Sequence, residues 1–347
     1  MIKILTSLRG IFIIFIFFYH CLHLYPGGGT MAVAFFFVLG GFSMTLGYKD
    51  KVLKLDFSYK QYITRRCIKF YPLHWLCLLA ILPLTLLSFN LKVIPVFFAN
   101  ATLLQTWIPI QKVYFSFNWV SWYLADTMFF ALMFPFLLKW IYKSRTNGRV
   151  LIAILIASLY VLVAFVIPKD MHHAILYVSP YMRLADFVFG IYLALLYQEL
   201  NKKVNINRNN SILSYILITV LIVLLVLESC WLSEDTTWFA PVYWPLVAIL
   251  IVYASLLSSN GGSKFWEHKY MLRLGELSFI IFMTHQIVLR YTKLVFDKIL
   301  HFDNNIIYVV LTLTLTVILS VIVDKYILKP ITQWLTKRIQ PSMTVRS

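Results

Sequence analysis

The chain has 347 residues, of which 61% are hydrophobic and 13% are charged. A soluble domain of this length cannot bury so much apolar surface, and apolar runs of about 20 residues, the length that crosses a bilayer, recur throughout. The composition therefore excludes a soluble protein and predicts an all-α integral membrane protein. The formal net charge of +17 does not call for a nucleic-acid partner, because the basic residues lie in short loops between apolar runs, where the positive-inside rule explains them.

The apolar runs lie, in chain order, at about 4–25, 31–48, 72–90, 93–108, 119–142, 150–168, 177–198, 211–232, 237–258, 276–296 and 305–328. The run at 93–108 is the weakest, because it is short and contains Pro95, Asn100 and Gln105. If it does not cross, about ten helices remain, both termini are cytoplasmic, and most of the 31 lysines and arginines fall on the cytoplasmic side. We therefore predict a bundle of about ten transmembrane helices, with an outer or re-entrant segment at about 91–118.

One transmembrane domain is expected over 1–335, followed by a short basic cytoplasmic tail at 336–347. The first run resembles a signal peptide, but no small-residue cleavage site follows it, so it is expected to remain as the first helix. No soluble appendage and no internal repeat is found. The tryptophans, including Trp122 and Trp244, are interpreted mostly as an aromatic belt at the membrane surface.

Arg9 and His20 are two ionisable residues inside the first apolar run. They are eleven residues apart, which on a helix is three turns plus about 20°, so both side chains lie on one face. At about 1.5 Å per residue His20 lies roughly 16 Å deeper than Arg9. Polar groups that share one face of an apolar helix are expected to line the protein interior or a water-filled cavity.

Six segments, in this order and covering about 4–335, resemble the membrane-bound acyltransferase-3 family, whose members O-acylate sugars at bacterial surfaces. The segments are Arg-x10-His at 9–20, "AFFFVLGGFSMTLGY" at 34–48, "YITRRCIKFYPLHWL" at 62–76, "SWYLADTMFFALMFP" at 121–135, "SPYMRLADFVFGIYLALL" at 179–196 and "LGELSFIIFMTHQIVL" at 274–289. Two positions depart from the family pattern: Gly40 stands where serine is usual, and Asp126 lies one position away from the usual glutamate.

Acyl transfer from a thioester to a hydroxyl needs a base that works near neutral pH, and histidine is suited to this role. His20 is the predicted general base, and a covalent acyl-histidine is the alternative. Acyl-CoA carries phosphates, so the basic stretch with Arg65, Arg66 and Lys69 is a predicted phosphate clamp, with Arg9 at the inner end of the His20 face.

Other polar residues are candidates for lining the substrate site, although each has a plain structural alternative as an interfacial or hydrogen-bonded group. They are His23, Asp126, Arg183, Asp186, Ser278 and His285. Arg183 and Asp186 are spaced as a helical ion pair. The cysteines show no CxxC spacing, so no disulfide and no metal site is predicted.

The resemblance implies an integral-membrane O-acyltransferase of the bacterial cytoplasmic membrane that uses acetyl-CoA. The acceptor would be a hydroxyl of a surface glycan or its lipid-linked precursor, with membrane lipid and other cell-envelope polysaccharide enzymes as partners. The oligomeric state is left open. The alternatives are an exporter of a polysaccharide precursor or small solute, and an acyltransferase with a lipid or protein acceptor. The absence of two matching halves weighs against the exporter.

Overall fold

The computed structural model describes residues 2–22, 28–86, 91, 93–144, 146–203, 211–232, 239–259, 264–300 and 304–339. Every regular element in these ranges is helical, which confirms the all-α prediction. The α-helices are α1 (Lys3–Leu22), α2 (Gly28–Val52), α3 (Tyr59–Leu86), α4 (Val93–Ala101), α5 (Gln111–Tyr114), α6 (Ser121–Lys143), α7 (Thr146–Val166), α8 (Pro180–Leu200), α9 (Ser211–Trp231), α11 (Trp244–Ser259), α12 (Lys269–Val295), α13 (Asn305–Ile322) and α14 (Lys329–Ile339).

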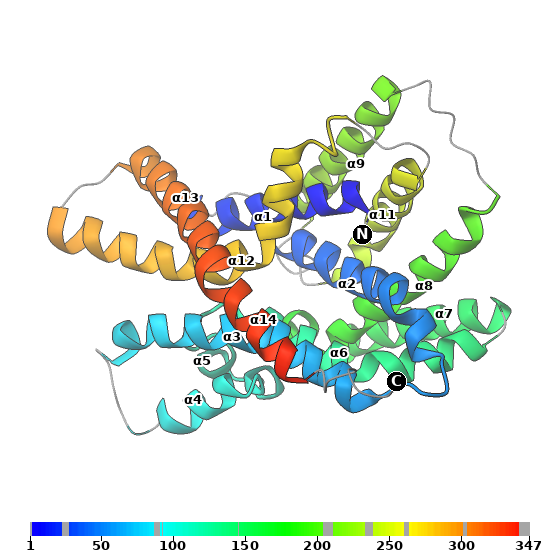
Figure 1. The fold of residues 1–347 in the computed structure, drawn as a ribbon, viewed down its shortest axis with the longest axis horizontal. Helices are drawn as coiled ribbons and strands as arrows, with labels where there is room; N and C mark the ends of the chain where they lie inside the picture. The colour runs from blue at the N-terminus through cyan, green and yellow to red at the C-terminus, as the bar shows by residue number, and fades with distance from the viewer. Residues whose placement is uncertain are drawn as a thin grey trace, which may run out of the picture.

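Single turns of other helix types join several of these elements. They are the 3₁₀ turns η1 (Gln105–Trp107), η2 (Lys169–Met171) and η4 (Ala240–Tyr243), and the π-helical turns η3 (His173–Val178), η5 (Phe296–Leu300) and η6 (Val323–Leu328). Through η6, α13 continues into α14, which lies beside α3 (Figure 1).

The described residues contain seven helical segments that are long and apolar enough to cross a membrane. The pair Lys169–Val178 and Pro180–Leu200, which bends by 47°, adds an eighth if it forms one span. Two further apolar helices, at Leu151–Val166 and Tyr215–Trp231, are shorter. The chain is thus a multi-pass membrane protein, while the count of about ten and the cytoplasmic position of both termini stay predictions.

The run at 93–108 does not form a long helix. Helix α4 has nine residues, about 14 Å at 1.5 Å per residue, less than half of the hydrocarbon thickness. Side chains of α3 hold the end of this segment: His74 Nε2 lies 2.8 Å from the carbonyl oxygen of Asn100, and Trp75 Nε1 donates to that of Ala101 at 3.1 Å. The segment therefore packs on α3 as short helices, and Figure 1 shows α4 and α5 beside α3.

Glycines set the closest helix crossings. A Cβ added at Gly41 of α2 would overlap the backbone of α8 at Phe187, and one added at Gly190 would overlap the backbone of α2 at Val38. Helices α1 and α12 cross in the same way, because a Cβ at Gly275 would overlap the carbonyl group of Thr6. Backbones approach this closely in membranes only where a small residue leaves room.

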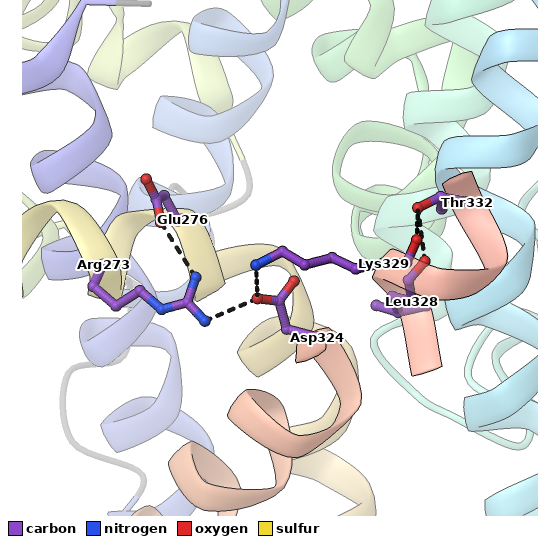
Figure 2. Close-up of polar contacts among 6 residues, drawn as sticks. All are labelled: Arg273, Glu276, Asp324, Leu328, Lys329 and Thr332. Carbon is purple, nitrogen blue, oxygen red and sulfur yellow. Dashed lines mark hydrogen bonds and ion pairs between the residues drawn. The ribbon is translucent and has the colours of Figure 1, made fainter. Parts of the chain in front are cut away.

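An ion-pair cluster ties the start of α12 to η6 and α14. Asp324 Oδ2 lies 2.8 Å from Arg273 Nη2 and 2.9 Å from Lys329 Nζ, and Arg273 also pairs with Glu276 at 3.3 Å. Figure 2 shows Asp324 between the two cations, with Thr332 bonded back to its own helix. One carboxylate thus fixes the direction of α14 relative to α12.

Candidate active site

Arg9 and Lys69 line one cavity of about 690 Å³, which is enclosed chiefly by α1 and α2, with Lys69 contributed by α3. Lys3 and Glu267 also line it, and their side chains form an ion pair of 3.6 Å. The four charged side chains of the lining are therefore three cations and one anion. This cavity suits an anionic ligand, and it brings together two residues that the sequence assigned to donor binding.

Arg65 and Arg66 point in different directions, as consecutive residues on a helix must. Arg65 lines a separate pocket of about 240 Å³ with Lys51 and Lys54. Arg66 is buried, and its guanidinium carbon lies 4.3 Å from the ring centre of Tyr48. The four predicted donor-binding residues therefore do not form a single clamp in this structure.

His20 lies beside His285. Their ring centres are 5.3 Å apart with an angle of 36° between the planes, although the two residues come from α1 and α12. His20 is half-buried and His285 is fully buried. The rings of Phe17 and Phe282 also border His285, at 6.4 Å and 5.9 Å between ring centres. A pair of imidazoles in an apolar surrounding thus occupies the far end of α1 from the Arg9 cavity.

The backbone fixes the tautomer of His285. Its Nδ1 lies 2.7 Å from the carbonyl oxygen of Phe282 and 3.2 Å from that of Ile281. Because carbonyl oxygens only accept hydrogen bonds, Nδ1 must carry the proton. The neutral ring then presents a lone pair at Nε2, which is buried without a hydrogen-bond partner among the described residues. The ring is therefore oriented as a hydrogen-bond acceptor.

Arg183 and Asp186 form the ion pair that their spacing predicts. Nη2 and Oδ2 are 2.9 Å apart, and both side chains are fully buried. Trp244 donates from Nε1 to Asp186 Oδ1 at 2.6 Å, and the guanidinium of Arg183 lies 5.0 Å from the ring centre of Phe37. This pair joins α8 to α11 and α2, which is the structural alternative that the sequence left open.

Asp126 is fully buried in α6, and the side chain of Thr106 is a hydrogen-bonding neighbour of its carboxyl group. Arg183 acts on it electrostatically. Ser278 is buried, and its hydroxyl donates to the carbonyl oxygen of Gly275 at 2.8 Å rather than toward His285. His23 lies outside the described residues.

Two tryptophans assigned to the aromatic belt are in fact interior residues, so that interpretation was wrong for them. Trp122 is 4% exposed and Trp244 is 8% exposed. The hydrogen bond from Trp244 to Asp186 joins residues 58 positions apart, and no local pattern could have indicated it. Glu267, the single acidic residue of the Arg9 cavity, was also missed, because it lies in a loop between apolar runs.

Comparison with known proteins identifies the family of the chain. The family model described as an acyltransferase domain matches residues 2–325. The acyltransferase MdmB of Streptomyces mycarofaciens is 25% identical over 289 residues, which cover 76% of this chain and 69% of that protein. No solved structure matches the chain. The match over nearly the whole length, with multi-pass helical architecture, shows that the chain belongs to the acyltransferase-3 family and is a membrane acyltransferase.

Proposed function

We propose that the protein is an O-acyltransferase that moves an acyl group, acetyl in the first instance, from cytoplasmic acyl-CoA to a hydroxyl of a surface glycan or its lipid-linked precursor. The observation that carries the proposal is the arrangement along α1. Arg9 lines a cationic cavity at one end of this helix, and His20 lies beside His285 at the other end. The two residues are about 16 Å apart along one unbroken helix.

The donor would bind at the Arg9 end. Its phosphates are anionic, and the cavity lining carries Arg9, Lys69 and Lys3 against Glu267 alone. Arginine forms paired hydrogen bonds with phosphate oxygens, and lysine adds a point charge. The pocket of Arg65, Lys51 and Lys54 offers a second cationic surface. The donor phosphates would therefore bind mainly in the Arg9 cavity, and Arg65 would contact the donor from its own separate pocket.

The reaction would take place at His20. Its imidazole takes the proton of the acceptor hydroxyl while the hydroxyl oxygen forms a bond to the thioester carbonyl carbon. The carbon–sulfur bond then breaks, and the CoA thiolate takes up the proton from His20. The products are a glycan ester and free CoA, and no other reactant is needed. General-base catalysis of this kind contributes about 10²–10⁴ in rate.

The experiment compares cells of the source organism with and without the gene. The O-acyl ester content of their surface glycans is measured by mass spectrometry before and after mild alkali. Loss in the deletion strain, restored by the wild-type gene and not by His20→Ala at equal abundance, is expected. Phe18→Ala serves as the control, because Phe18 lies about 200° around the helix from His20. Unchanged glycan acylation in the deletion strain would overturn the proposal in favour of a lipid or protein acceptor or of transport.

The donor site has its own test. In purified protein, Arg9→Ala with Lys69→Ala should raise KM for acetyl-CoA more than Arg65→Ala does, because the first two residues share the cavity. Charge-assisted contacts are worth about 1.5–3 kcal/mol each, so losing one corresponds to about 10- to 150-fold in KM. An unchanged KM in the double variant would mean that the cavity does not bind the donor.

A further inference from the structure

His285 is a buried titratable group to which the reaction proposed above assigns no role. It is fully buried in α12, and its Nδ1 proton is engaged by two backbone carbonyl oxygens of its own helix. Leaving a buried polar atom unpaired is destabilising, so the unpartnered Nε2 calls for an explanation.

The surroundings of His285 limit what Nε2 can bind. The rings that border it are those of Phe17, Phe282 and His20, at 6.4, 5.9 and 5.3 Å between ring centres. Only His20 among them carries an N–H group. This structure contains no direct bond between the two imidazoles, but at 5.3 Å between centres a rotation of the half-buried His20 ring would bring one of its nitrogens within hydrogen-bond distance of His285 Nε2.

We propose that His285 is a positioning residue for His20. Its Nε2 accepts a hydrogen bond from one N–H of His20, so the other ring nitrogen of His20 presents its lone pair to the acceptor hydroxyl. When His20 takes up the hydroxyl proton, the same bond stabilises the imidazolium that forms. The arrangement follows the logic of catalytic triads, in which a third group holds the histidine in one tautomer, with a neutral imidazole in place of the carboxylate.

The crossing of α1 and α12 supports this role. A Cβ at Gly10 would lie 2.9 Å from Leu274 Cγ and 3.1 Å from the backbone nitrogen of Gly275. His20 and His285 each lie ten residues beyond these glycines, so the two helices run parallel from the glycine crossing to the histidine pair. Rigid packing of two helices, rather than a loop, therefore sets the distance between the rings.

The inference rests on the proposed function, and its test is built on two substitutions at His285. Glutamine places an amide oxygen near the position of Nε2 and can accept the bond, whereas leucine fills similar space and cannot. If His285 positions His20, His285→Gln should keep most of the glycan acylation. His285→Leu should lose about 10- to 100-fold of it, by analogy with groups that orient metal-bound histidines. KM for acetyl-CoA should stay unchanged in both.

His74→Leu is the matched control. His74 is also buried, also bonds one ring nitrogen to a backbone carbonyl oxygen, and also has a second nitrogen without a partner in the described part of the chain. It bonds to Asn100 rather than bordering His20. Its loss should lower the amount of folded protein without lowering acylation per molecule, which separates a structural effect from a positioning effect.

A spectroscopic measurement makes the test independent of turnover. Nitrogen-15 NMR of histidine-labelled protein in lipid distinguishes the two neutral tautomers, and the His20 signals are assigned by their absence in His20→Ala. The wild type should show one tautomer of His20, and His285→Leu should show a mixture.

The outcomes separate the two proposals. Wild-type restoration of glycan acylation with failure of His20→Ala supports the proposed function, whatever His285 does. Equal loss in His285→Gln and His285→Leu, or a His20 tautomer that His285→Leu does not change, would overturn the positioning role. Equal loss of acylation in His285→Gln and His285→Leu would also indicate that His285 itself transfers a proton.

Discussion

The glycine crossing of α1 and α12 allows a sharp test, through Gly275→Ala. The added methyl group would lie 2.5 Å from the carbonyl carbon of Thr6, with the carbonyl oxygen nearer still, while real Cβ contacts do not fall below 3.0 Å. The carbon alone demands a shift of at least 0.5 Å, and the oxygen in front of it demands a separation on the order of 1 Å.

Two energy terms oppose each other in this variant. Alanine stabilises a helix interior by up to about 1 kcal/mol relative to glycine. Overpacking costs about 1–3 kcal/mol, and the upper end applies because the obstacle is backbone rather than a flexible side chain. We expect net destabilisation of about 1–2 kcal/mol. A displacement near 1 Å can also cost about 10²-fold in rate, so His20 should lose activity beyond the loss of stability.

The assay pairs thermal unfolding of purified protein in detergent with glycan acylation at matched abundance. Gly40→Ala is the control, because its Cβ would meet the Phe187 ring at 3.7 Å, an ordinary contact. It should keep or raise the midpoint of unfolding. A Gly275→Ala protein with the unfolding midpoint and the acylation of the wild type would refute the close crossing and the distance between the histidines that depends on it.

Three further predictions concern the rest of the molecule. Arg183→Met should lower the free energy of unfolding by about 3–5 kcal/mol, because it leaves Asp186 charged and buried. Adding Asp186→Asn, which keeps an acceptor for Trp244, should recover most of the unfolding midpoint. If the midpoint does not recover, the ion pair is not the source of the loss. Asp324→Asn should lower that midpoint only slightly, since its partners are partly exposed. It should speed tryptic cleavage at Lys337 and Arg338, because α14 loses its ion pairs. An unchanged cleavage rate would mean that the cluster in Figure 2 does not hold α14. Single cysteines at Lys54 and Lys264 in a cysteine-free protein should react with an impermeant thiol reagent only after the cells are opened, and labelling of intact cells at either position would contradict the predicted topology.

The helices were predictable from the sequence because a bilayer requires long apolar runs, and those runs need no partner to be recognised. The spacing of Arg9 and His20 was equally readable, since both lie on one continuous helix. The short helices around Asn100 followed from polar residues that a spanning helix would not tolerate.

Contacts between distant segments could not be read in this way. His20 and His285 meet because glycines let α1 and α12 approach, and no local period reports such a crossing. Lys69 joins Arg9 in one cavity whereas Arg65, four positions earlier, lines another pocket. The sequence of a basic stretch gives the number of its charges but not the directions in which the side chains point. Helix packing decides which of these side chains line the same cavity.

Helix α1 has a consequence for how this protein can change. It runs unbroken from Lys3 to Leu22, and it carries the cationic cavity at one end and the histidine pair at the other. Exchanging one apolar residue for another between Gly10 and Tyr19 leaves unchanged the angle about the helix axis between Arg9 and His20. Inserting or deleting a single residue there would leave hydrophobicity and charge intact and yet turn His20 by about 100° relative to Arg9. This stretch should therefore tolerate apolar substitutions of similar volume far better than changes in length.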